Sequence, residues 1–114
     1  MDNHFGRGLM KGIHSKQPMN SQRITGYCDD FKRGYVIGYT HHLMETTHDT
    51  ELASRVAGCL TRQYGLDKEA MIDIFTEYQR SSSVSAFVSG YAITAQSIER
   101  DETTHGWPEA MSSA

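Results

Sequence analysis

The 114-residue chain has only two cysteines, two prolines and one tryptophan, and it lacks any long apolar run. Two cysteines are too few for a scaffold held by several disulfides. Cys28 and Cys59 also lack the paired spacing of zinc motifs, so we expect two buried free thiols in apolar helical surroundings. A membrane-spanning helix needs about 20 consecutive apolar residues, which no segment here offers.

An excess of charge of one sign is also missing, because 11 Lys and Arg residues stand against 14 Asp and Glu residues. This balance gives no broad attraction to nucleic acid or to acidic lipid headgroups. The first residues do not form an apolar run followed by a cleavage site, so we expect a cytoplasmic location. The length predicts one domain, which we place at residues 1–100, followed by a flexible, disordered tail at 101–114. Whether the tail docks through Trp107 is left open.

Apolar residues recur at helical spacing along most of the chain, and no segment alternates in the manner of a strand. The pattern predicts an all-α fold, a compact bundle of four to five short helices. Asp49 or Thr50 is a suitable N-cap, Gly65 a suitable left-handed stop, and Asp67 a suitable cap for the helix that follows. We expect a loop at 17–26 and helices at 3–16, from 30 to about 48, from 50 to 64, from 67 to about 80, and at 84–98.

A short pattern, Phe-x-x-Gly-[Leu/Tyr]-x-x-[Gly/Thr], occurs three times, beginning at Phe5, Phe31 and Phe87. Glycine is unfavourable in a helix by about 1 kcal/mol relative to alanine, so its retention favours close approach of another backbone. Our interpretation is that three helices meet face to face around these glycines, and the alternative is coincidence among short helices. The predicted packing or interaction face consists of Phe31, Gly34, Tyr35, Gly38 and His42.

Four stretches of the chain resemble the YghW family, short enterobacterial proteins with a domain of unknown function. They are Asn3–Met10, Asp30–Tyr39, Leu60–Glu69 and Phe87–Tyr91. The resemblance runs from about Asn3 to Tyr91 and implies a bacterial, cytosolic setting. It implies no active site, cofactor or partner.

Three kinds of functional site are alternatives to plain packing of the helices. The segment around Gly65 has the apolar–glycine–apolar spacing of a helix-turn-helix. Its second helix, however, carries four acidic residues against only Lys68 and Arg80, so phosphates would be repelled. His41, His42 and His48 lie close in sequence, yet no His-x-x-x-His pair occurs, so we predict no metal site. No catalytic triad, phosphate loop or metalloprotease motif is present, and no cofactor is expected.

The function therefore stays unknown at this stage, and an interaction protein is the favoured class. Six tyrosines suit an interface, although tyrosines in a small core also keep their hydroxyls at its rim. We predict that the protein binds another protein or itself, with a homodimer as one form and nucleic acid disfavoured. A helix-turn-helix DNA reader and a small enzyme are the alternatives. Six cations are also candidates for a basic patch on an otherwise acidic molecule: Arg7, Lys11, Lys32, Arg33, Arg55 and Arg62.

Overall fold

The computed structural model describes residues 3–79 and 82–92, and within them it confirms the all-α fold. It has one helix more than the sequence predicted, because the expected loop at 17–26 contains a single helical turn. The tail predicted at 101–114 and Trp107 lie outside the described residues. The helices are α1 (His4–Ile13), α2 (Ser21–Ile24), α3 (Asp29–Thr47), α4 (Thr50–Gln63), α5 (Lys68–Tyr78) and α6 (Val84–Tyr91).

Side-chain caps explain where most of the helices begin. Asn3, Asn20, Asp49, Asp67 and Ser83 each accept a hydrogen bond from a backbone N–H in the first turn of the helix that follows. Such caps satisfy donors that have no partner inside the helix. The Asn20 cap, which the sequence reading missed, helps to order the extra helix α2, and the wholly buried Ile24 anchors it.

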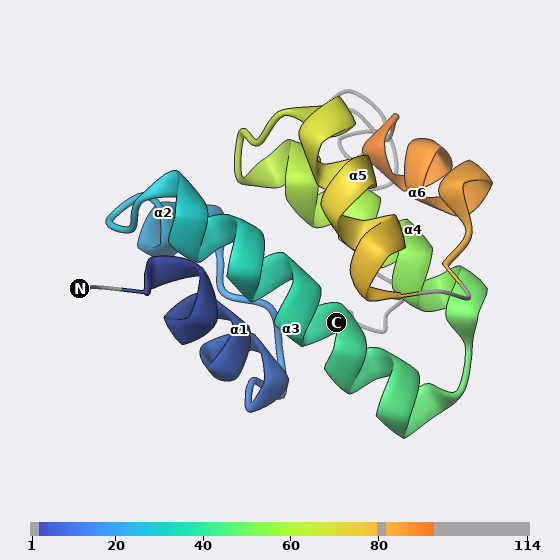
Figure 1. The fold of residues 1–114 in the computed structure, drawn as a ribbon, viewed down its shortest axis with the longest axis horizontal. Helices are drawn as coiled ribbons and strands as arrows, with labels where there is room; N and C mark the ends of the chain where they lie inside the picture. The colour runs from blue at the N-terminus through green and yellow to red at the C-terminus, as the bar shows by residue number, and fades with distance from the viewer. Residues whose placement is uncertain (1–2, 80–81, 93–114) are drawn as a thin grey trace, which may run out of the picture.

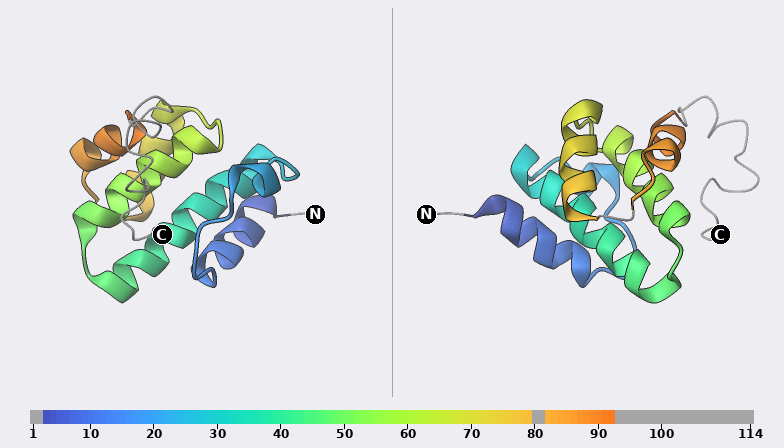
Figure 2. Two further views of the ribbon diagram at one scale, coloured as in Figure 1. Left: turned by 180° about the vertical axis from the view of Figure 1, so that it is seen from behind. Right: turned by 45° about the vertical axis from the view of Figure 1, so that its right-hand side comes forward.

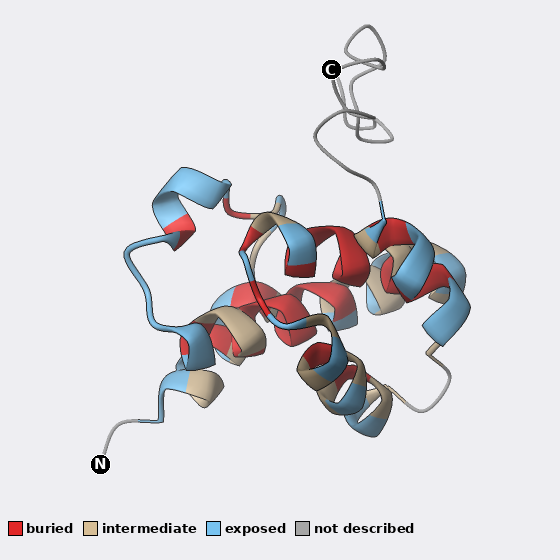
Figure 3. Cartoon of the chain, turned by 90° about the horizontal axis from the view of Figure 1, so that it is seen from above, coloured by how far each residue is buried: buried red, intermediate tan, exposed pale blue. Residues whose placement is uncertain are grey.

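The helices form two groups that pack against each other (Figure 1, Figure 2). Helix α1 lies along α3, helix α6 lies along α4, and α5 packs against α3, α4 and α6. Buried residues gather on the faces that the helices turn toward one another (Figure 3). None of the described helices has the length and apolar content that crossing a membrane requires. The largest fully buried apolar side chains are Tyr35, Phe75, Phe87, Ile24, Ile37, Leu60, Met71 and Val36.

The contact between α1 and α3 is made through glycines. A Cβ atom on Gly8 would overlap the carbonyl oxygen of Phe31, and one on Gly12 would lie 2.6 Å from the backbone nitrogen of Tyr39. Gly34 and Gly38 meet the backbone of α1 in the same reciprocal way. Because Gly8 pairs with Gly34 and Gly12 with Gly38, the two helices run in the same direction. The segment between α1 and α2 runs back along them (Figure 2).

The third copy of the pattern makes a separate contact, which corrects the expectation that three helices meet at one place. A Cβ atom on Gly90 of α6 would overlap the carbonyl oxygen of Arg55, and one on Gly58 of α4 would overlap that of Phe87. Gly58 lies outside the repeated pattern because no phenylalanine precedes it by three residues. The fold therefore has two glycine crossings, and Thr94 of the third copy lies outside the described residues.

The two cysteines differ in exposure. Cys59 is buried, as expected, and burial raises the pKa of its thiol to about 11. Cys28 is exposed, which corrects the prediction that both thiols are buried. The sequence suggested burial because Cys28 lies near an apolar helical segment, but Cys28 is the N-cap of α3 and is followed by the acidic Asp29 and Asp30.

We expect one fast-reacting thiol in the folded protein. Cys28 should react with a disulfide reagent such as dithionitrobenzoate within minutes at pH 8, because the reagent needs access and a thiolate. Cys59 should react only after a denaturant is added. A Cys28→Ser variant that still shows one fast thiol would contradict the burial of Cys59.

Candidate functional site

The predicted face on α3 lies inside the molecule. Phe31, Gly34, Tyr35 and Gly38 are buried, with both glycines against α1. His42, one turn further along α3, is only half-buried. The structure thus places four of the five residues in packing between helices, and binding of a partner at this face stays a prediction.

The other sequence candidates do not converge. His41 and His48 are exposed, and the described residues contain no group of three or more His, Cys, Asp or Glu side chains arranged to hold a metal ion. The residues of the predicted basic patch come from three helices, with Arg55 and Arg62 on α4 and the others on α1 and α3, and their joining into one surface stays a prediction. Arg33 pairs with Asp30 at 2.7 Å.

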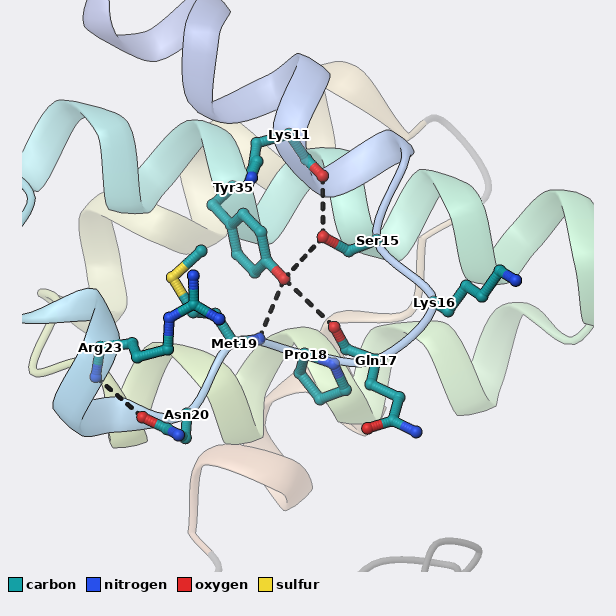
Figure 4. Close-up of a pocket in the computed structure, with 9 residues that line it drawn as sticks. All are labelled: Lys11, Ser15, Lys16, Gln17, Pro18, Met19, Asn20, Arg23 and Tyr35. Carbon is teal, nitrogen blue, oxygen red and sulfur yellow. Dashed lines mark hydrogen bonds between the residues drawn. The ribbon is translucent and has the colours of Figure 1, made fainter.

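A polar pocket of about 480 Å³ lies where the segment after α1 turns into α2, over α3 (Figure 4). We call it the α1–α2 pocket. The sequence did not indicate this pocket, because its walls come largely from the segment 17–26, for which the sequence predicts only a loop. The pocket is lined by Lys11, Ser15, Lys16, Gln17, Pro18, Met19, Asn20, Arg23 and Tyr35.

The hydroxyl of Tyr35 fixes the segment that forms the pocket wall (Figure 4). It accepts a hydrogen bond from the backbone N–H of Met19 at 2.9 Å. It also lies within donating distance of the Ser15 hydroxyl, at 3.0 Å, and of the Gln17 carbonyl oxygen, at 3.3 Å. The Ser15 hydroxyl in turn donates to the carbonyl oxygen of Lys11 at 2.8 Å. A single buried side chain therefore holds three positions of the segment.

Tyr64, at the end of α4, holds the same segment from the other side. Its hydroxyl donates to the carbonyl oxygen of Met19 at 2.5 Å. Burial raises the pKa of Tyr64 well above its usual range, and the nearby hydroxyls of Tyr35 and Tyr39 add to this effect. Tyr64 therefore remains a neutral donor throughout the ordinary pH range. Both backbone groups of Met19 are satisfied by tyrosines from different helices.

The charged walls of the pocket are all basic. Lys11, Lys16 and Arg23 line it, no carboxylate does, and none of the three has an ion-pair partner within the described residues. The Lys16 side chain extends outward at the rim (Figure 4). Ammonium and guanidinium groups are the donors that bind carboxylates and phosphates.

The side chains that line the pocket include hydrogen-bond donors of the kind that bind anions. Among the residues that the structure describes, Ser15 and Tyr35 supply the hydroxyls that line the pocket, and no histidine or carboxylate lines it. An unactivated serine hydroxyl is a poor nucleophile. The sequence signal that could have located the pocket is the spacing of Lys11, Lys16 and Arg23 around Pro18.

Comparison with known proteins gives a family but no activity. A family model described as "Protein of unknown function (DUF2623)" matches residues 1–93, which include every helix that the structure describes. No solved structure matches the chain.

Proposed function

We propose that this protein, which belongs to the DUF2623 family, acts by binding rather than by catalysis, and that the α1–α2 pocket holds an anionic group. The observation that carries the proposal is the set of three cationic side chains, Lys11, Lys16 and Arg23, which surround a polar cavity without ion-pair partners in the described chain. The pocket wall is also fixed in advance by Tyr35 and Tyr64, so little ordering is needed when a ligand enters.

Titration with inorganic pyrophosphate at low ionic strength tests the proposal. We expect saturable shifts of the backbone amide resonances of Ser15, Met19 and Arg23, which weaken as salt is added because the cations are exposed. Arg23→Ala should lower the affinity by roughly 3- to 10-fold, the usual effect of losing one charge-assisted hydrogen bond at a solvated site.

Arg55→Ala is the matched control. It also removes one cation, partly exposed, but Arg55 lies on α4 and pairs there with Glu51. This variant should bind pyrophosphate as the unaltered protein does. Equal losses in Arg23→Ala and Arg55→Ala would indicate attraction to net charge alone, and the absence of saturable shifts would refute the pocket as an anion site.

An exposed tyrosine that stacks on a buried phenylalanine favours protein binding as a second function. Tyr27 stays exposed although its ring stacks on that of Phe31, with centroids 4.0 Å apart and planes 10° apart. Rigid exposed tyrosines are favoured at protein interfaces. This pair lies at the start of α3, close to the face that the sequence predicted for a partner.

The setting of the protein is part of the proposal. The resemblance to the YghW family supports a bacterial, cytoplasmic protein, and the match of a family model over residues 1–93 agrees with the extent of that resemblance. Subcellular fractionation of the producing bacterium, with the protein detected by antibody, tests this location.

A further inference from the structure

We infer that the anionic group in the α1–α2 pocket comes from a second copy of this chain, as carboxylates on the exposed face of its helix α5. This inference rests on the proposed function, since it names the partner of the same pocket. A carboxylate from another protein and a free phosphate compound are the competing occupants, and the experiment below separates them.

Helix α5 carries a row of unpaired carboxylates. Glu69, Asp73 and Glu77 are spaced by four residues, so they lie along one face of the helix. All three are exposed, and none has an ion-pair partner within the described residues. Like charges at this spacing repel one another, so a cationic surface placed against the row relieves that repulsion.

The charges of the chain are separated in a way that favours contact between copies. Residues 1–48 contain six Lys and Arg against four Asp and Glu, whereas residues 49–114 contain five against ten. The pocket draws its cations from the first part, and α5 belongs to the second. Opposite charge on two surfaces of one molecule makes two copies complementary to each other.

Helix α5 does not enter the pocket of its own chain. A contact between the α5 carboxylates and the α1–α2 pocket therefore has to join two copies. No residue of α5 lines the pocket, and within the molecule α5 packs against α3, α4 and α6. In a two-fold arrangement each copy presents α5 to the other's pocket, so both pockets are filled and the assembly closes as a dimer. Lys11 and Arg23 would then pair with the partner copy's carboxylates across the interface.

Sedimentation equilibrium at low ionic strength provides the test. We expect a dimer of twice the 12.8 kDa chain mass, which dissociates when 0.5 M NaCl or excess pyrophosphate is added. The triple variant Glu69→Gln, Asp73→Asn and Glu77→Gln should weaken dimerisation by about tenfold or more, as expected for the loss of several solvated ion pairs. Glu51→Gln, which removes one carboxylate from α4, is the control and should dimerise normally.

Charge reversal makes the test specific. A copy with Lys11→Glu and Arg23→Glu, and a copy with Asp73→Lys and Glu77→Lys, should each dimerise poorly alone. Mixed together they should associate, because the reversed pocket of one then faces the reversed α5 of the other. Absence of association in the mixture, with both variants folded by circular dichroism, would overturn the inference.

The two proposals fail in different ways. A protein that remains a monomer at all concentrations but still binds pyrophosphate would overturn the α5 inference and leave the anion pocket in place. A dimer that the triple variant does not weaken would also overturn it, because another surface would then join the copies. A monomer that binds no pyrophosphate would overturn both.

Discussion

Gly34→Ala is expected to lower the free energy of unfolding by about 2 kcal/mol, because the added methyl group would overlap the carbonyl oxygen of Phe5. A side chain in that position can rotate away, but a backbone carbonyl held in α1 cannot. Overpacking of a tight contact costs about 1–3 kcal/mol, and alanine's better helix propensity returns up to about 1 kcal/mol. Gly34→Leu, which adds more volume at the same place, should cost about 3 kcal/mol or more.

Urea denaturation followed by far-ultraviolet circular dichroism measures this effect, and the melting temperature should fall by roughly 10 °C. Gly26→Ala is the control, since its Cβ would meet only the carbonyl oxygen of Arg23, at an ordinary 3.7 Å. Gly58→Ala should destabilise the α4–α6 crossing in the same way as Gly34→Ala destabilises the α1–α3 crossing. Equal midpoints for Gly34→Ala and Gly26→Ala would show that the helices do not touch at Gly34.

Tyr35→Phe is expected to cost about 1–3 kcal/mol of stability, because it leaves the buried N–H of Met19 without its acceptor. The ring is retained, so the loss reports the hydroxyl alone. The same change should weaken pyrophosphate binding, since the segment from Ser15 to Met19 then loses the group that holds it in place. Denaturant midpoints and the amide titration measure the two effects on one sample.

Tyr78→Phe is the matched control for the hydroxyl. Tyr78 is 53% exposed, and its hydroxyl makes no hydrogen bond with another of the described residues. Its loss should change stability by less than about 0.5 kcal/mol. If Tyr35→Phe were equally harmless, the pocket wall would not depend on the hydrogen bonds of Tyr35.

Much of the fold was predictable from the sequence because local signals determine it. Asp67 and the left-handed Gly65 lie where the sequence placed them, and of the two residues predicted to cap α4 it is Asp49 that does so, since each of these signals acts on its own helix end. The glycine pattern on α1 and α3 correctly indicated close backbone contact, because helical glycines have few other uses.

The pairing of the helices could not be derived locally. Gly58 has no phenylalanine three residues before it, so no repeat pointed to α4 as the partner of α6. The pocket was missed for a related reason. Its wall depends on Tyr35 and Tyr64, which lie far along the chain from Met19 and reach it only through the tertiary fold.

The common direction of α1 and α3 constrains how the chain assembles. Two helices that run the same way cannot be joined by a tight turn, so residues 14–28 must first travel back along them. Closing the loop of residues 14–28 costs conformational entropy, and this cost is offset only once α1 and α3 are in contact. We therefore expect α1 to be added late in folding, onto an α3 already supported by α4. Deleting α1 would leave a bare strip of α3 backbone open to water, and such a truncated chain would be prone to aggregate.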